Sequence, residues 1–285
     1  MSNVIETFQK KKEYMVCVDS DGCAMDTMDV KHFRCFGPCM IREWGLEPWK
    51  EEMEQYWNEV NLYTMTRGIN RFKALERVLR WADERFCRID GLSELTAWAE
   101  NAKELSAGNL KDAIDAGGGK ILKKTFEWSA AVNREIDALP DHEKTPFEGV
   151  KETLRLIHEK ADIAVVSSAN EQAILEEWNM YGLLQYTDVI LSQDAGSKQF
   201  CIGELLKKGY EKDHVLMVGD APGDRMAARN NGVLYYPVLV KKEAESWKRL
   251  RKEALKRLFS GTFRGAYESG LEQEFEENLT PKTPE

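Results

Sequence analysis

The spacing of apolar positions changes along this sequence and divides it into segments. Residues 14–18 (YMVCV) form a short apolar run that ends in the polar residues DSDG, a pattern typical of a buried strand that leads into a loop. From about residue 24 to residue 139, apolar residues recur at spacings of three and four, which predicts helices. From residue 146 on, short apolar runs alternate with amphipathic stretches, which predicts strands separated by helices.

The second half of the chain carries the pattern of a parallel sheet with crossover helices. The apolar runs that predict its strands are DIAVV at 162–166, DVILS at 188–192, HVLMVGD at 214–220 and GVLYYPVLV at 232–240. The predicted helices lie at about 150–160, 171–180, 200–209 and 221–230. Since the first strand lies more than 100 residues earlier, the simplest account is an α/β domain with a helical insertion after its first strand.

This account sets three parts of the chain. We expect residues 1–23 and 145–240 to form the α/β core, residues 24–144 to form the helical insertion, and residues 241–285 to form a helical extension packed on the core. Within the insertion, the periodicity predicts helices at about 69–86 and 121–139, and the stretch GNLKDAIDAGGGK (108–120) between them is expected to be a loop. In the extension, Trp247, Leu250, Ala254 and Leu258 share one helix face.

Composition limits the classes to which the protein can belong. The chain has 285 residues, of which 42% are hydrophobic and 31% charged, as in soluble globular proteins. No apolar run approaches the ~18 residues that a membrane helix needs, so no membrane association is expected. The formal net charge of −9 argues against a nucleic-acid partner, because a phosphate backbone attracts basic proteins.

Six cysteines bear on the compartment. The first residues carry basic side chains but no apolar stretch of signal-peptide length behind them, which predicts a cytoplasmic protein with reduced thiols. The cysteines show no spacing typical of a zinc site, so we expect free and mostly buried side chains.

Four polar clusters follow the predicted strands, each at the point where an apolar run ends. They are Asp19-Ser20-Asp21-Gly22, Ser167-Ser168, Lys198, and the segment from Gly219 to Asp224 with Asp220. The carboxyl ends of parallel strands face one crevice in which ligands bind, so these clusters are expected to converge.

The residue types in this crevice suit a phosphoryl group. Asp19, Asp21, Asp220 and Asp224 would repel one another unless a hard divalent cation neutralised them, and carboxylate oxygens suit Mg²⁺. A lysine and a serine hydroxyl beside backbone N–H groups favour an anion.

The chemistry that follows is covalent catalysis by an aspartate. Asp19, at the tip of the first strand, is the expected nucleophile and would form an aspartyl-phosphate. Asp21, two residues on, could protonate the leaving group and then deprotonate the attacking water. Gly22 permits the sharp turn that this arrangement requires.

The order of these motifs resembles that of the haloacid dehalogenase superfamily. DSDGCAMDT resembles the first motif of the family, DxDGTLxDS, and PFEGVKETLRLIHEKADIAVVSSAN resembles the approach to the second. VGDAPGDRMAARNNGV resembles the fourth, and Lys198 stands for the third. The resemblance covers residues 14–27 and about 145–236, and its nearest likeness is to the phosphoglycolate phosphatase and β-phosphoglucomutase branch.

The resemblance implies a Rossmann-like parallel sheet with an α-helical cap inserted after the first strand. It implies that Asp19, Asp21, Asp220 and Asp224 hold Mg²⁺, with Asp21 contributing its backbone carbonyl. It further implies that Ser167, Ser168 and Lys198 hold the transferred phosphoryl group, and that a small phosphorylated metabolite is the substrate.

Several alternatives stay open at this point. Ser167 is preferred to Ser168 because it directly follows the apolar run, and Lys207 or Lys208 could replace Lys198 if the register is wrong. A phosphomutase would use the same two aspartates as a phosphatase, and an inactive interaction protein would use the charged C-terminal segment. The sequence predicts no oligomeric state.

Overall fold

A computed structural model of the chain describes residues 3–280. These residues form two compact units, one made of the segments up to Met28 and from Asp141 on, the other of Asp29–Pro140. The sequence placed the corresponding boundaries at residues 23/24 and 144/145, four to five residues away on each side. We describe each unit by itself.

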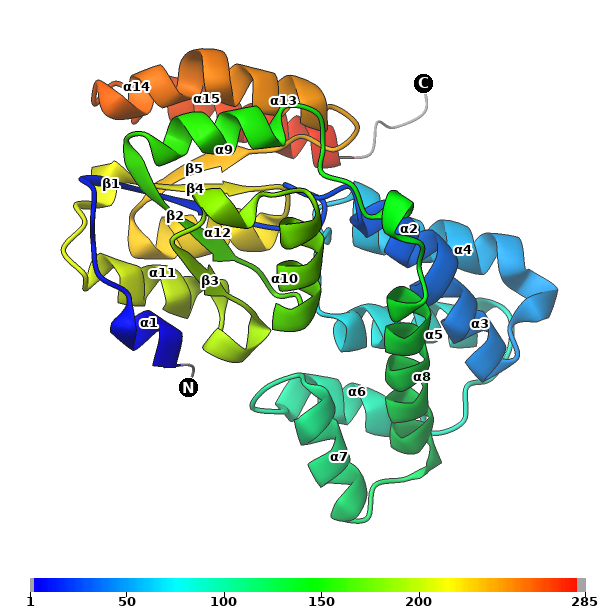
Figure 1. Cartoon of the computed structure of the whole chain (residues 1–285). Helices are drawn as coiled ribbons and strands as arrows, with labels where there is room; N and C mark the ends of the chain where they lie inside the picture. The colour runs from blue at the N-terminus through cyan, green and yellow to red at the C-terminus, as the bar shows by residue number, and fades with distance from the viewer. Residues whose placement is uncertain (1–2, 281–285) are drawn as a thin grey trace, which may run out of the picture. The chain divides into compact units, whose positions relative to one another are not determined.

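The first unit contains a five-stranded parallel sheet with the strand order β3-β2-β1-β4-β5 (Figure 1). The strands are β1 (Tyr14–Val18), β2 (Ala161–Val166), β3 (Val189–Leu191), β4 (Val215–Gly219) and β5 (Leu234–Pro237). Their residues are buried almost throughout, as expected for a parallel sheet covered on both faces. Each strand lies where the apolar runs predict it, and the α/β fold class is confirmed.

Helices cover both faces of this sheet. In Figure 1, α9 and α13 lie above it and α11 and α12 below it. The helices of this unit are α1 (Asn3–Thr7), α9 (Val150–His158), α10 (Glu171–Met180), α11 (Lys198–Leu206), α12 (Pro222–Asn231), α13 (Glu243–Arg249), α14 (Leu255–Phe259) and α15 (Ala266–Leu279). A π-helical segment, η8 (Leu250–Ala254), joins α13 to α14, and short 3₁₀ turns lie at Asp141–Glu143, Leu184–Tyr186, Gln193–Ala195 and Lys212–His214.

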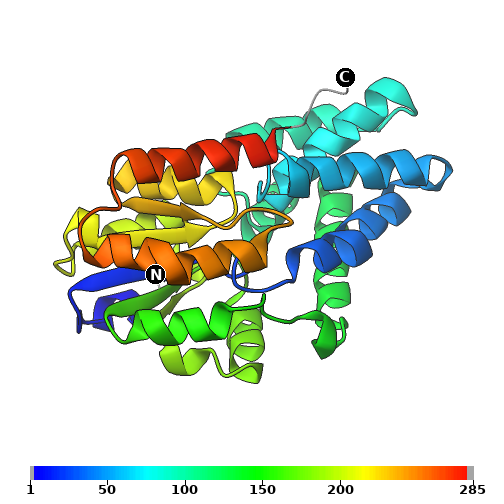
Figure 2. The same ribbon diagram turned by 90° about the horizontal axis from the view of Figure 1, so that it is seen from above.

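The segment after residue 240 belongs to the same hydrophobic core. Trp247, Leu250, Ala254 and Leu258, the face that the sequence singles out, are completely buried against side chains of α9 and the sheet. The last helix, α15, lies along the edge strand β5 (Figure 2). Its Glu268 accepts a hydrogen bond from the backbone N–H of Tyr235 at 3.0 Å, so a side chain partly covers this sheet edge.

The second unit is helical. Its elements are α2 (Met28–Lys31, whose first residue lies in the first unit), η1 (His32–Phe36), α3 (Gly37–Trp44), η2 (Glu47–Trp49), α4 (Lys50–Asn58), η3 (Glu59–Tyr63), α5 (Arg71–Arg85), α6 (Leu92–Asn101), α7 (Ala107–Asp115) and α8 (Lys120–Asp137). They enclose a separate core in which Trp57 and Trp128 are completely buried.

One expectation for this unit is wrong. The stretch at 108–120 was expected to be a loop, but most of it forms α7. Ser106 begins the helix by accepting a hydrogen bond from the backbone of Asn109, and Leu110 is fully buried. The helix ends only at the run of glycines, where Gly117 adopts a φ of 104° that favours glycine.

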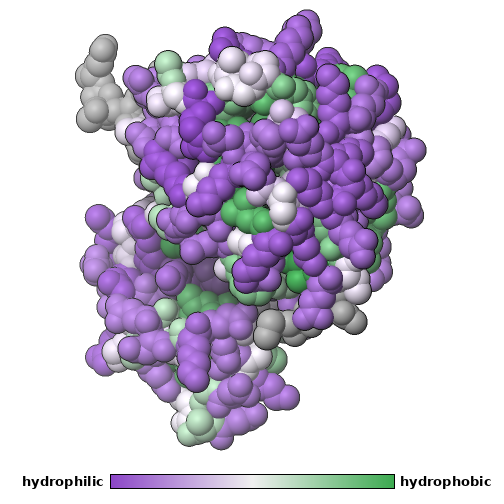
Figure 3. Space-filling view, turned by 90° about the vertical axis from the view of Figure 1, so that its left-hand side faces the viewer, coloured by the Kyte–Doolittle hydropathy of each residue, from purple (hydrophilic) through white to green (hydrophobic). Residues whose placement is uncertain are grey.

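The surface agrees with the high content of charged residues. The face drawn in Figure 3 is mostly hydrophilic, with hydrophobic residues in small scattered groups. Among residues 3–280, no helix combines the length and the apolar character required to cross a membrane.

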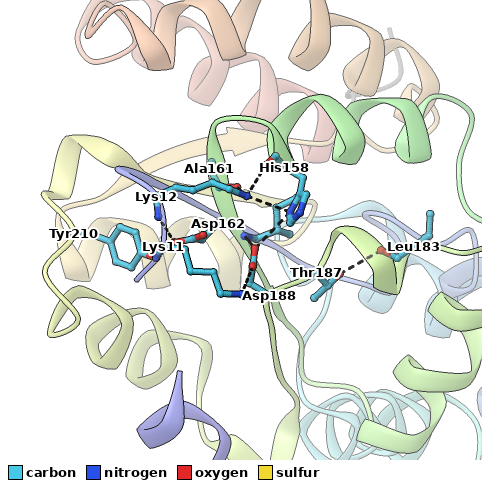
Figure 4. Close-up of polar contacts among 10 residues, drawn as sticks. Lys11, Lys12, His158, Ala161, Asp162, Leu183, Thr187, Asp188 and Tyr210 are labelled. Carbon is cyan, nitrogen blue, oxygen red and sulfur yellow. Dashed lines mark hydrogen bonds and ion pairs between the residues drawn. The ribbon is translucent and has the colours of Figure 1, made fainter. Parts of the chain in front are cut away.

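A buried polar cluster lies where β1 and β2 begin (Figure 4). Asp162 is fully buried and accepts hydrogen bonds from the backbone N–H groups of Lys11 and Lys12, at 2.8 and 3.0 Å, and from the hydroxyl of Tyr210. Asp188 accepts from the ammonium of Lys11 at 2.9 Å. These bonds fix the segment before β1 against β2, at the end of the sheet opposite to the predicted site.

Candidate active site

The predicted site residues lie at the carboxyl ends of adjacent strands. Asp19 directly follows β1, Ser167 follows β2, and Asp220 follows β4, while Lys198 begins α11 after β3 and Asp224 lies in the first turn of α12. Since β3, β2, β1 and β4 are neighbours in that order, the topology brings these positions to one edge.

Three carboxylates and one ammonium form the centre of the site. The Nζ atom of Lys198 lies 2.8 Å from Oδ2 of Asp19 and 2.5 Å from Oδ1 of Asp224. Asp19, Asp220 and Asp224 each offer one carboxylate oxygen, and these oxygens lie within 4.8 Å of one another. All three aspartates are buried, with at most 6% of their surface exposed. Residues up to 205 positions apart in the sequence therefore converge.

This arrangement perturbs the charges of its members. Burial raises the pKa of Asp19 to about 6, although Lys198 acts in the opposite direction. Burial also raises the pKa of Asp224, and the negative charge of Asp220 adds to the effect. Burial lowers the pKa of Lys198, but the two carboxylates outweigh it and raise the pKa above its usual range. Burial therefore disfavours the charged form of both carboxylates, and the ammonium of Lys198 favours it.

The loop after β1 orients the two aspartates of the first motif. The backbone N–H of Ser20 donates to Oδ1 of Asp19 at 2.8 Å. Gly22 adopts a φ of 77° and its N–H donates to the carbonyl of Met25, which closes the turn. Asp21 is partly exposed and, among residues 3–280, its side chain is not in the group of three carboxylates. Its assigned contribution through the backbone carbonyl stays a prediction.

The sequence interpretation missed a side chain that orients Asp21. The hydroxyl of Thr27 donates a hydrogen bond to Oδ1 of Asp21 at 2.6 Å, and Thr27 itself is fully buried. Thr27 is the last residue of the string DSDGCAMDT, so the motif held the signal although no role was assigned to it. A second contact had no signal in the sequence: the indole N–H of Trp178 donates to the hydroxyl of Ser20 at 2.9 Å.

Close packing holds the loop after β4. A Cβ atom on Gly219 would lie 2.4 Å from the carboxyl carbon of Asp224, so this position admits no side chain without displacing the carboxylate. Asp224 also accepts a hydrogen bond from the N–H of Ala221 at 3.0 Å, which caps α12. Asp224 is therefore fixed by its own loop as well as by Lys198.

The two serines after β2 differ in environment. Ser167 is 4% exposed, its N–H donates to the carbonyl of Leu191, and its hydroxyl accepts from the N–H of Ala169 at 3.2 Å. Ser168 is exposed. Ser167 thus lies buried at the carboxyl end of β2, and its preference over Ser168 as a phosphate ligand stays a prediction.

Three lysines were candidates for the third motif. Lys198 contacts two site carboxylates, whereas Lys207 pairs with Glu204 at 2.5 Å and Lys208 donates to the carbonyl of Glu6 at 2.9 Å. Lys207 and Lys208 therefore have their partners outside the site, and Lys198 is the candidate that lies within it.

The thiols agree with the sequence interpretation. All six cysteines are free, and five of them are buried. Cys23 lies beside the site, and burial, together with the negative charges of Asp220 and Asp19, raises its pKa well above the usual value. This thiol therefore stays neutral and acts as a small packing side chain.

Comparison with known proteins gives a match to the family model described as haloacid dehalogenase-like hydrolase, over residues 92–238. The match includes Ser167, Lys198, Asp220 and Asp224 but not Asp19. A curated relative, the pyrophosphatase PpaX of Halalkalibacterium halodurans, is 28% identical over 137 residues, which are 43% of this chain and 64% of the relative. The matched part thus spans less than two thirds of that protein.

Solved structures with a similar arrangement share little sequence with this chain. A putative phosphoglycolate phosphatase from Lactobacillus delbrueckii subsp. bulgaricus is 14% identical with a TM-score of 0.49, and the match covers 79% of this chain and 85% of the other. A putative beta-phosphoglucomutase from Thermotoga maritima is 16% identical with a TM-score of 0.47, covering 79% and 84%. The family-model match extends over more than half of the sequence, and the chain therefore belongs to the haloacid dehalogenase-like hydrolase family.

Proposed function

We propose that this chain is a Mg²⁺-dependent phosphatase that hydrolyses a small phosphorylated metabolite through an aspartyl-phosphate on Asp19. The observation that carries the proposal is the buried group of Asp19, Asp220 and Asp224 with Lys198 between two of its members. A charged group of this kind at the carboxyl edge of a parallel sheet suits the transfer of a phosphoryl group.

The donor set fits a magnesium ion. An octahedral ion with oxygen ligands at about 2.1 Å places adjacent ligands ~3.0 Å apart and opposite ligands ~4.2 Å apart. One carboxylate oxygen from each of the three aspartates lies within 4.8 Å of the others, so modest side-chain movements would bring them to one ion. Burial and neighbouring negative charge raise the pKa values of Asp19 and Asp224, and a cation bound beside them would act in the opposite direction. When bound, Mg²⁺ would neutralise these carboxylates and the charge of the phosphoryl group.

In the proposed reaction, a carboxylate oxygen of Asp19 attacks phosphorus, and the bond from phosphorus to the ester oxygen breaks. Asp21 donates a proton to the departing alkoxide. Asp21, now a carboxylate, removes a proton from water, and this water attacks the phosphorus of the aspartyl-phosphate and releases inorganic phosphate. Lys198 and Ser167 hold the phosphoryl oxygens, and the hydrogen bond from Thr27 orients Asp21.

The helical unit has a proposed role in catalysis as well. We infer that residues 29–140 act as a cap that selects the substrate and excludes water during the reaction. We propose a cytoplasmic location, because all six cysteines are free, as expected in a reducing compartment.

The test is phosphate release from sugar phosphates, nucleotides, phosphoglycolate and an aryl phosphate. Inorganic pyrophosphate is also tested, because the matched relative is named a pyrophosphatase. We expect release from at least one compound with Mg²⁺ and none with EDTA. Isomerisation of a sugar phosphate without net release would show a mutase instead. Release that is equal in Mg²⁺ and EDTA would contradict the proposal.

A further inference from the structure

The C-terminal helix α15 contacts the residue that follows Asp224. Arg225 lies with Asp224 in the first turn of α12, and its side chain is 11% exposed. Its Nη1 atom lies 2.5 Å from Oε1 of Glu276, and its guanidinium carbon lies 5.3 Å from the ring centroid of Phe275. Two neighbouring residues of α15 thus hold one arginine, by an ion pair and by a cation–π contact.

The same helix supports the other end of the acidic loop through β5. The hydroxyl of Tyr235 donates to the carbonyl of Gly219 at 3.0 Å. The ring of Tyr235 meets that of Phe275 edge to face, with 5.7 Å between centroids. Phe275 therefore contacts residues that brace both ends of the segment from Gly219 to Arg225.

We propose that α15 positions the acidic loop for cation binding, with Glu276 and Phe275 as positioning residues that act through Arg225 and Tyr235. The inference rests on the proposed function, since it supposes that Asp220 and Asp224 hold Mg²⁺. It goes further by making the affinity for the cation depend on a helix about 50 residues beyond the loop in the sequence. The carboxylate of Glu276 itself touches neither substrate nor metal in this account.

The structure provides a matched control on the same two helices. Arg229, one turn after Arg225 in α12, and Glu272, one turn before Glu276 in α15, form an ion pair of the same kind, with Nε of Arg229 3.1 Å from Oε1 of Glu272. This second pair joins α12 to α15 as the first does. Its arginine lies five residues beyond Asp224, not next to it. A general effect of helix attachment would appear on removal of either pair.

The experiment measures Mg²⁺ binding by isothermal titration calorimetry on the full chain, with no substrate present. The variants are Glu276→Ala, Glu276→Gln, Phe275→Leu and, as control, Glu272→Ala. Circular dichroism first establishes that each variant is folded. Glu276→Gln keeps the length and one acceptor oxygen, so it should fold even if Glu276→Ala does not.

We expect Glu276→Ala and Phe275→Leu to weaken Mg²⁺ binding about 3- to 10-fold, below the effect of removing a group bonded directly to a ligand. Glu276→Gln should recover part of this loss, and Glu272→Ala should bind within about 2-fold of the wild type. In turnover assays, saturating Mg²⁺ should restore kcat of Glu276→Ala, because the substituted residue acts only through the loop.

Two results would overturn the inference, and they are distinguishable. Equal Mg²⁺ affinity in the wild type, Glu276→Ala and Glu272→Ala would show that α15 only adds stability, while the proposed function would stand. A wild-type protein that binds no Mg²⁺ would contradict the proposed function and, with it, the inference.

Discussion

Lys198 contacts the buried carboxylates of Asp19 and Asp224. The stability of the site depends on the positive charge that Lys198 places between these two negative charges. The side chain of Lys198 is 15% exposed, and the carboxyl groups of Asp19 and Asp224 that it contacts are 8% and 0% exposed. Removal of one partner from a buried ion pair leaves a charge without compensation, which is costly even though the intact pair adds little net stability. The residue is thus structural in the free protein and a phosphate ligand in the proposed reaction.

Lys198→Met, which keeps an unbranched side chain one atom shorter and removes the charge, should lower the free energy of unfolding by about 3 kcal/mol in EDTA. The loss should be smaller in saturating Mg²⁺, because the cation can then neutralise the carboxylates. Urea unfolding in the two conditions measures both values. Lys207→Met is the control, since its exposed pair with Glu204 contributes at most ~1 kcal/mol. A variant as stable as the wild type in EDTA would contradict this account of the charges.

At the scale of elements, the site depends on how tightly the loop between β4 and α12 is packed. Gly219 ends β4 and Gly223 lies in the first turn of α12, but only Gly219 is confined. A Cβ on Gly219 would overlap Asp224, whereas a Cβ on Gly223 would meet nothing within 4 Å. Neither residue has a positive φ, so the two differ in space rather than in backbone conformation.

Gly219→Ala should therefore destabilise the protein by about 1–3 kcal/mol and weaken Mg²⁺ binding, since Asp224 must move. Gly223→Ala should leave both within error or add slight stability through the unfolded state. Thermal unfolding and calorimetric titration of the two variants test this. The same effect from both substitutions would show that the close packing at Gly219 is unimportant.

The polar cluster at the opposite end of the sheet should govern stability in acid (Figure 4). Burial raises the pKa of Asp188, but hydrogen bonds from the N–H of Ile163 and from Lys11 outweigh it and lower the pKa below its ordinary value. Because the folded pKa is lowered, the contribution of Asp188 is complete above the unfolded value of about 3.9 and is lost as pH falls through the folded value.

Asp188→Asn should accordingly reduce the dependence of stability on pH below about pH 4, as measured by urea midpoints between pH 2 and pH 7. Asp194→Asn, which changes an exposed carboxylate near the end of β3, is the control and should keep the wild-type slope. If Asp188→Asn also keeps the wild-type slope, the ion pair with Lys11 does not stabilise the folded state.

At the scale of the whole molecule, the chain consists of two units with separate hydrophobic cores, and the predicted ligands lie in one of them. A cation that binds only the folded form of that unit stabilises it by mass action. The C-terminal helices belong to the same unit, so cation binding and the attachment of α15 concern one folding unit.

We expect Mg²⁺ at about 100 times its Kd to stabilise the first unit by about 2.7 kcal/mol, visible as a higher Tm. Scanning calorimetry with Mg²⁺ and with EDTA measures the shift. Asp220→Asn should reduce it, and Asp194→Asn should not. No shift in the wild type would count against a resident cation.

Most of the sheet and the centre of the site could be predicted from the sequence because their signals are local. The apolar runs mark the strands, and Asp19, Lys198, Asp220 and Asp224 each follow one of them. The contacts of Trp178 with Ser20 and of Glu276 with Arg225 could not be predicted, since they join segments 158 and 51 residues apart by side-chain packing alone. The prediction of a loop at 108–120 is wrong because the glycines dominate the local sequence pattern, whereas the Ser106 cap and the burial of Leu110 stabilise a helix.

The central claim, that Asp19 is the nucleophile, is tested most directly by Asp19→Asn. The variant keeps the shape of the side chain but removes the anionic oxygen, and it is assayed with Mg²⁺ on the best substrate of the panel. Asp26→Asn, which changes an exposed carboxylate in the same loop, is the control. We predict a loss of at least ~10³-fold in kcat for Asp19→Asn with the fold retained, and near wild-type activity for Asp26→Asn. A folded Asp19→Asn variant that keeps its activity would contradict the account.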